Sequence, residues 1–155
     1  MKILITGSSG YVGSALAQAI INNGDDEVYT LDTYSPSYPL KTKVTHINLD
    51  LTDFNRVRER LKDLEFDVVV HLAAKIRGEP YDIMKINVMG TINLLESIRE
   101  KNFRLLIAAS TAAQLYRNAH YLPIDEKHPV TPVTPYGFSK YLMAVSYTHL
   151  TLPTN

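Results

Sequence analysis

A glycine-rich turn close to the N-terminus constrains the fold of this chain more than any other feature. Its three glycines are spaced three residues apart. The apolar run 1–6, which contains β-branched residues, predicts a strand before the turn. The run 14–21 predicts a helix after it, with Val12, Leu16 and Ile20 along one face. The chain therefore begins with a strand that passes through glycines into a helix.

Such a turn directs several free backbone N–H groups at one point, which also lies at the positive end of the helix dipole. That point suits a pyrophosphate. Gly7 allows the tight turn, Gly10 lets the backbone approach the phosphates, and Gly13 lets the helix pack against the strand. Glycines also form ordinary turns between strands and helices, so the spacing alone is weak evidence. With a strand before it and a helix after it, we predict dinucleotide binding at Gly7, Gly10, Tyr11, Val12 and Gly13.

The next predicted strand, Glu27–Asp32, ends in an acidic residue nineteen positions after Gly13. In a strand–helix–strand unit this places a carboxylate beside the adenosine ribose, whose hydroxyls can donate hydrogen bonds to it. A hydrogen bond to a charged acceptor contributes about 1.5–3 kcal/mol. The same charge would repel a 2′-phosphate, so Asp32 favours NAD over NADP. The alternative is that Asp32 caps a turn beside Thr33 and Ser35.

Composition excludes several classes of protein. A chain of 155 residues can form one domain with one core. Sixteen basic residues balance sixteen acidic ones, so binding to nucleic acid or to an anionic membrane has no electrostatic support. No run approaches the roughly 20 apolar residues that span a membrane. Cysteine is absent and the five histidines show no metal-binding spacing, so we predict a cytoplasmic protein without a metal site.

Predicted strands alternate with predicted helices along the rest of the chain. The continuous apolar run Asp67–Leu72 is typical of a strand covered on both faces. Thr52 or Asp53 can cap the helix that follows the third strand. The other strands are predicted at 44–49 and 104–109, and the other helices at 54–64, at 84–98 and from Tyr136 onward. This alternation predicts an α/β protein with a Rossmann-type, doubly wound parallel sheet, whose ligands bind beyond the carboxyl ends of the strands.

Tyr136 and Lys140 lie four residues apart where the last predicted helix begins, and therefore on one helix face. A phenol is a poor base at neutral pH, but a nearby ammonium group stabilises the phenolate and lowers its pKa. Tyr136 could then exchange a proton with a substrate hydroxyl while a hydride moves to or from a nicotinamide. Lys140 could also hold the nicotinamide ribose. Many helices carry such a pair by chance, but its place after a dinucleotide turn and a proline-rich loop favours catalysis.

Three further polar residues lie at the ends of predicted strands. Ser110 and Thr111 close the fifth strand, where a hydroxyl can donate to a substrate oxygen and position it. The alternative is that they only cap or end the strand. His71 lies in an apolar run and is interpreted as a hydrogen-bonded core residue and not as a ligand. Hydrolysis by a Ser/His/Asp triad is not expected, because the chain has no G-x-S-x-G elbow.

From Met1 to about Met143, the chain resembles the extended short-chain dehydrogenase/reductase family, the NAD-dependent sugar epimerases and dehydratases. The motifs that carry the resemblance occur in the family's order; they are Thr6–Gly13, Asp32, Asp50–Asp53, His71–Ala74, Asn87–Glu96 and Pro135–Lys140. Together they are specific for the family but not for a substrate.

The resemblance implies NAD as the cofactor, a nucleotide sugar as the substrate and a homodimer as an assembly of the full-length protein. It implies that Asp50 and Leu51 flank the adenine, and that Asn87 supports the site. It also implies roles for further residues: Leu72, Ala73 and Ala74 in lining the cofactor, and Tyr136, Lys140 and a Ser or Thr near position 110 in the chemistry.

The chain departs from the family pattern at the Ser or Thr that is expected to bind the substrate. The family usually has Ser or Thr four residues before a Tyr-Gly pair, but here Arg117 follows Tyr116, and Ala112 lies four residues before it. Counting from the strand favours Ser110, with Thr111 still open. The Thr-Asp-Glu signature of 4,6-dehydratases is absent. A nucleotide-sugar epimerase is the leading interpretation; the alternatives are a reductase or dehydratase of the family, and a non-catalytic NAD(H)-binding regulator or scaffold.

The run Val145–Thr154 fits neither the helix begun at Tyr136 nor the family, and it resembles a translated sequencing adapter, the transposase mosaic end with its extension. We therefore expect native sequence to stop at about Met143 or Ala144. Residues 1–144 would then be a truncated NAD-binding domain and residues 145–155 a non-native tail. The substrate region would be missing, and the chain alone is expected to be inactive.

Overall fold

The computed structural model describes residues 1–37, 40–117 and 119–151. These residues form a five-stranded sheet in the order β3-β2-β1-β4-β5, in which all neighbouring strands are parallel. The strands are β1 (Lys2–Thr6), β2 (Glu27–Asp32), β3 (Thr45–Asn48), β4 (Val68–His71) and β5 (Leu105–Ala108). The predicted Rossmann-type parallel sheet is therefore confirmed.

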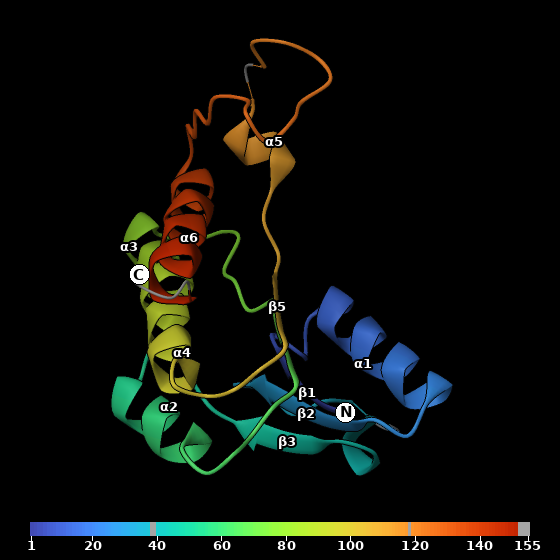
Figure 1. Cartoon of the computed structure of the whole chain (residues 1–155). Helices are drawn as coiled ribbons and strands as arrows, with labels where there is room; N and C mark the ends of the chain where they lie inside the picture. Colours follow the sequence, from blue (N-terminus) through green and yellow to red (C-terminus); the bar gives the residue numbers. More distant parts are fainter. Residues whose placement is uncertain (38–39, 118, 152–155) are drawn as a thin grey trace.

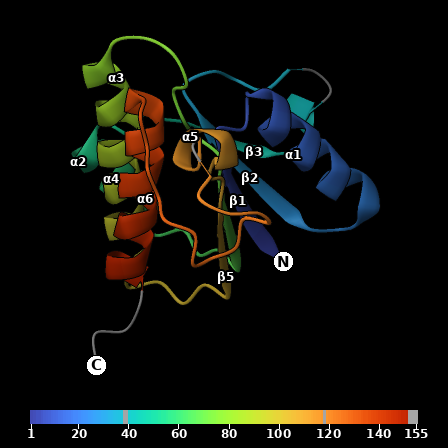
Figure 2. The same cartoon turned by 90° about the horizontal axis from the view of Figure 1, so that it is seen from above.

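Helices cover both faces of the sheet. Figures 1 and 2 show α1 on one face and α2, α4 and α6 on the other. The helices are α1 (Tyr11–Asn23), the 3-10 helix η1 (Leu40–Thr42), α2 (Phe54–Leu61), α3 (Pro80–Met84), the π-helix η2 (Lys85–Met89), α4 (Gly90–Ile98), α5 (Ala112–Leu115) and α6 (Pro135–Thr151). None of the helices in the described ranges is long and apolar enough to cross a membrane.

Each face of the sheet contributes to a separate apolar cluster, because successive side chains of a strand point to opposite faces. In β1, Ile3 and Ile5 pack with Ala17 of α1, whereas Leu4 packs with Leu94 and other residues of the opposite cluster. All five of these side chains are at most 5% exposed. This double burial explains why the strands are continuous apolar runs and not alternating ones.

The inner face of α1 differs from the predicted one. Leu16 and Ile20 pack against the core as expected, but the Val12 side chain is 61% exposed. Gly13 and Ala17 are the buried residues of this helix. The prediction for Val12 is wrong because the face of α1 that packs closely is the one with Gly13, which lies against the turn at Gly7 and Ser8.

The predicted helix over 84–98 is part of a longer helical segment, which begins at Pro80 and passes through η2 and α4. The face predicted from a spacing of four and three residues is buried at Thr91, Leu95 and Ile98, but Met84 and Val88 at its start are only partly buried. The sequence pattern did not reveal that Lys85–Met89 forms a π-helical turn. This turn contains Asn87, and π-helical turns are frequent at functional sites.

Helix α6 does not break at Val145 as expected but continues to Thr151. Tyr147 and Leu150 lie four and seven residues after the buried Met143, so they face the same side and pack against the core. The expected mismatch with the helix is therefore wrong for residues 145–151. Residues 152–155 of the predicted tail lie outside the described residues.

Candidate active site

The glycine turn joins β1 to α1 in the conformation that a phosphate-binding turn needs. Gly7 has φ +69°, and a Cβ on it would lie 2.6 Å from the backbone nitrogen of Ala73. The Gly10 N–H donates to the carbonyl of Gly7 at 3.2 Å. No side chain caps the N-terminus of α1, and its first turn carries no acidic residue. The first-turn N–H groups of this 13-residue helix are therefore available to an anion.

A cavity of about 500 Å³ opens beside this turn, at the carboxyl ends of the strands. Eight of the predicted cofactor residues line it: Gly7, Gly10, Asp32, Asp50, Leu51, Leu72, Ala73 and Ala74. The structure thus brings four separate motifs of the sequence together around one space of a size typical of ligand pockets.

Asp32 lies at the end of β2, and its carboxylate accepts two backbone hydrogen bonds. One oxygen accepts a hydrogen bond from the Ser9 N–H at 3.0 Å, and the other accepts one from the Tyr34 N–H at 3.2 Å. The carboxylate therefore caps a turn and also lines the cavity. The hydrogen bond from the Ser9 N–H fixes the position of the Asp32 carboxylate relative to the glycine turn.

Five predicted cofactor residues do not line the cavity. Tyr11 is 91% exposed and Val12 is 61% exposed, so only their backbone N–H groups face the phosphate position of the turn. Gly13 is buried against the turn, where a Cβ would lie 2.3 Å from the Gly7 oxygen. Asn87 and Lys140 are buried, at 0% and 3% exposure, and Asn87 bonds to the backbone of Lys75 in the cavity wall.

Lys75 and Ile86, with Thr33 and Tyr34, line the cavity but were not among the predicted site residues. Lys75 follows Ala74 at the end of β4, so the rule that ligands bind beyond carboxyl ends could have identified it. Its ammonium group forms an ion pair with Asp82 at 2.9 Å. Ile86 comes from the π-helical turn, and no sequence signal placed it near the strand ends.

Helix α6 brings Tyr136 and Lys140 to the end of β5. The Lys140 ammonium group donates to the carbonyl of Ala109 at 2.8 Å, immediately before Ser110. Helix α5 supports α6 from the side, because a Cβ on Gly137 would lie 2.7 Å from the Gln114 carbonyl oxygen. The structure therefore places Lys140 beside the residue that precedes Ser110.

The electrostatic state of the pair differs from the sequence expectation. Burial raises the pKa of Tyr136 above its ordinary value. The Lys140 ammonium group lies 5.8 Å from the centre of the Tyr136 ring and bonds to Ala109, so it does not stabilise the phenolate here. The expected lowering of the Tyr136 pKa is therefore not seen in this structure.

Burial lowers the pKa of Lys140 from 10.5 to about 8. Between these values the unfolded chain holds a proton that the folded protein releases, so the free energy of unfolding rises with pH in this range. We expect the Lys140→Met variant to lack this rise. Chemical denaturation between about pH 8 and 10 measures the free energy of unfolding of both proteins. An equal dependence on pH in the two proteins would contradict the burial of the Lys140 charge.

Ser110 and Thr111 follow β5 without belonging to it. Thr111 occupies the N-cap position of α5, but its side chain makes no capping hydrogen bond. Ser110 is exposed. Both residues remain candidates for the substrate-binding hydroxyl, and the alternative that they only cap or end the strand stays open.

His71 is a hydrogen-bonded core residue, as the sequence predicted. It is 1% exposed, and its two ring nitrogens contact Thr6 and Thr91 at 2.6 and 2.9 Å. Burial, with a smaller contribution from the Lys140 charge, lowers the pKa of His71 to about 3. The ring is therefore neutral at physiological pH.

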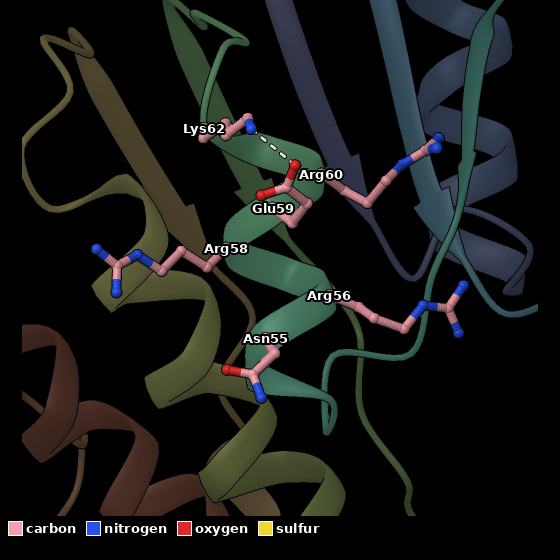
Figure 3. A pocket seen from close by; sticks show the side chains of 6 residues that line it. All are labelled: Asn55, Arg56, Arg58, Glu59, Arg60 and Lys62. Atoms are coloured by element: carbon pink, nitrogen blue, oxygen red, sulfur yellow. Dashed lines mark hydrogen bonds and ion pairs between the residues drawn. The ribbon is translucent and has the colours of Figure 1, made fainter.

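A larger hollow of about 860 Å³ lies on α2, and no predicted site residue lines it. In Figure 3, Arg58 extends to the opposite side of the helix from Arg56 and Arg60. The three guanidinium groups therefore do not converge on one point. Lys62 forms an ion pair with Glu59 of the same helix at 2.7 Å. This hollow is interpreted as a solvated charged face and not as the functional site.

The sequence matches the model of the NAD dependent epimerase/dehydratase family over residues 3–150. The chain is similar to UDP-glucose 4-epimerase of Streptomyces lividans, with 37% identity over 147 residues, 90% of this chain and 44% of that protein. It is 32% identical over 150 residues to UDP-glucose 4-epimerase of Lactobacillus helveticus, covering 92% of this chain and 45% of that protein.

Solved structures show the same similarity. UDP-glucose 4-epimerase of Thermotoga maritima with UDP-glucose superposes with a TM-score of 0.85 and 26% identity, covering 98% of this chain and 53% of that one. The Bordetella bronchiseptica enzyme WbmG in complex with NAD superposes with a TM-score of 0.86 and 25% identity, covering 99% and 51%. The chain thus spans about half the length of the relatives that it matches.

Proposed function

Because the chain belongs to the NAD dependent epimerase/dehydratase family, we propose that it is the cofactor-binding half of an NAD-dependent nucleotide-sugar epimerase. The observation that carries the proposal is the uncapped N-terminus of α1 beside a cavity that Asp32 and Asp50 line. This arrangement offers free N–H groups to a pyrophosphate and a carboxylate to a ribose. The residues present therefore fit NAD.

Each part of NAD has a proposed partner in the chain. The N–H groups of the glycine turn would hold the pyrophosphate, and Asp32 the adenosine ribose. Asp50 and Leu51 would flank the adenine, and the wall that contains Ala73 would lie along the cofactor. Lys140, freed from the Ala109 carbonyl, would hold the nicotinamide ribose.

When bound, NAD supplies the group that accepts a hydride from a sugar carbon and returns it. Tyr136 would act as the phenolate, stabilised by the Lys140 ammonium group once it leaves the Ala109 carbonyl; it would take the proton of the sugar hydroxyl and later give it back. Ser110 or Thr111 would hold the same oxygen by a hydrogen bond. We propose a nucleotide sugar as the substrate of the complete protein and a homodimer as its assembly, as the family resemblance implies.

We expect the chain to bind NAD at least about tenfold more tightly than NADP, a difference of about 1.4 kcal/mol. The Asp32→Asn variant should lose most of this preference, because it removes the charge that repels the 2′-phosphate. An amide oxygen also cannot accept from both Ser9 and Tyr34 as the two carboxylate oxygens do. Calorimetric titration of both proteins with both cofactors measures the ratio.

The matched control is Asp25→Asn, which removes the same charge at an exposed position outside the cavity. It should leave both affinities unchanged. Equal or tighter binding of NADP by the original chain would contradict the role proposed for Asp32.

We also propose that native sequence ends near Met143 or Ala144 and that residues 145–155 are adapter-derived. The resemblance of this run to a translated adapter supports the proposal. Two findings stand against the expected mismatch: residues 145–151 are helical, and the family model matches through residue 150. Sequencing the locus from source DNA tests it, and an authentic stop codon after Asn155 would contradict it. Experiments on turnover therefore use the complete coding sequence.

A further inference from the structure

A buried chain of hydrogen bonds begins beneath the wall of the proposed NAD cavity. The N–H of Ala73, which lines the cavity, donates to Oγ1 of Thr6 at 3.3 Å. Oγ1 of Thr6 lies 2.6 Å from Nδ1 of His71, and Nε2 of His71 lies 2.9 Å from Oγ1 of Thr91. The three side chains are at most 1% exposed. The series joins the ends of β1 and β4 to α4.

The donors along this series fix one tautomer of His71. The single hydroxyl proton of Thr91 is donated to the carbonyl of Asn87, which can only accept. The bond between Thr91 and His71 must therefore be donated by Nε2–H of the ring. Nδ1 then has no proton and accepts from the Thr6 hydroxyl. Protonation of both nitrogens would leave the Thr6 hydroxyl without its acceptor.

A second set of bonds continues from Asn87 to the helix of Tyr136. The Asn87 side chain accepts from the Lys75 N–H at 2.6 Å and donates to the Lys75 carbonyl at 2.9 Å. It also donates to Oγ of Ser139 at 2.8 Å, and Ser139 in turn donates to the carbonyl of Tyr136 at 2.7 Å. Asn87 and Ser139 are both 0% exposed. The series thus reaches from the cavity wall to the first turn of α6.

We propose that His71 is a positioning residue. Its single neutral tautomer fixes the backbone of Ala73, in the cavity wall, relative to the helical segment that carries Asn87. This inference rests on the proposed function, since the wall at Ala73 is the one assigned to NAD. It goes beyond that function because neither His71 nor Thr91 lines the cavity. A histidine that only filled space would need no hydrogen bonds, whereas His71 accepts from one buried hydroxyl and donates to another.

The tautomer is tested first, on the wild-type chain. Nitrogen-15 shifts of the His71 ring, recorded by NMR between pH 5 and pH 8, should show a protonated Nε2 and an unprotonated Nδ1 throughout. The titratable side chains that face the ring are Lys140 and Tyr147, both on α6. A protonated Nδ1, or titration of the ring within this range, would overturn the inference.

The positioning role is tested by NAD titration of Thr91 variants. Thr91→Val keeps the side-chain volume but removes the hydroxyl that bonds to Nε2–H of His71, to the Asn87 carbonyl and to the Tyr147 phenol, and we expect NAD binding to weaken at least fivefold. Thr91→Ser keeps the hydroxyl and should stay within twofold of wild type. The matched control is Thr30→Val: Thr30 is also 0% exposed and contacts a histidine, His46, at 3.0 Å, but outside the series. This control should keep wild-type NAD affinity even where its unfolding temperature falls.

Unchanged NAD affinity in a folded Thr91→Val variant would overturn the positioning role. Equal weakening in Thr30→Val would do so too, because the effect would then follow from lost stability alone. Should Thr91→Val not fold, the nitrogen-15 shifts of the wild-type chain still decide the inference. Failure of the wild-type chain to bind NAD would instead contradict the proposed function and would leave the tautomer to be decided by the shifts.

Discussion

Replacement of Tyr136 by Phe in the complete protein is expected to lower turnover by about 10²- to 10⁴-fold. The change removes the phenol oxygen that would carry the substrate proton but leaves the ring in place. NAD affinity should stay nearly unchanged, because Tyr136 does not line the cavity assigned to the cofactor. Steady-state kinetics with a nucleotide sugar and calorimetry with NAD measure the two effects separately.

Tyr141→Phe is the matched control, since Tyr141 lies on the same helix and is 41% exposed. It should retain wild-type turnover. Unchanged turnover in Tyr136→Phe would remove Tyr136 from the mechanism. Retained NAD binding without any turnover in the wild-type protein would favour the non-catalytic regulator or scaffold.

Gly13→Ala is expected to weaken NAD binding at least about tenfold and to destabilise the fold by about 1–3 kcal/mol. A Cβ at this position would lie 2.3 Å from the Gly7 carbonyl oxygen and 2.8 Å from the Ser8 Cα. Both are backbone atoms, so α1 must move away from the turn. That movement displaces the N–H groups proposed to hold the pyrophosphate. Calorimetry and chemical denaturation of the chain measure the two losses.

Gly24→Ala is the control for a glycine at the other end of α1. Gly24 has an extended backbone, and a Cβ there would meet only a carboxylate oxygen of Asp26 at 3.9 Å. This variant should keep NAD affinity, with stability unchanged or slightly raised by a less flexible unfolded chain. A Gly13→Ala variant that matches Gly24→Ala in both measurements would contradict the close packing of α1 on the turn.

The fold could be predicted from the sequence where the pattern is local. The strand over Glu27–Asp32 matches its prediction to the residue, and its four inner residues are all buried. Asp53 caps α2 as expected, with its carboxylate accepting from the Arg56 N–H at 3.1 Å. The cavity also follows from sequence, since the motifs lie at strand ends and these ends share one edge in a parallel sheet.

Features that depend on long-range packing could not be predicted in this way. Val12 has the spacing of a core residue, but the contact of Gly13 with the turn decides which face of α1 is buried. The pKa of Tyr136 depends on which group the Lys140 ammonium contacts. That group is the Ala109 carbonyl, which is distant in sequence from both Tyr136 and Lys140. The series through His71 joins residues 20 to 65 positions apart, so no local pattern reveals it.

The reaction of the complete protein decides whether this chain is the NAD-binding half of a nucleotide-sugar epimerase, as proposed. The recovered gene product is incubated with nucleotide sugars while NADH absorbance and product stereochemistry are followed. We expect an epimer to form without net production or consumption of NADH, because the hydride returns to the sugar. Stoichiometric consumption of NADH would contradict the claim in favour of a reductase, and loss of water from the sugar would contradict it in favour of a dehydratase.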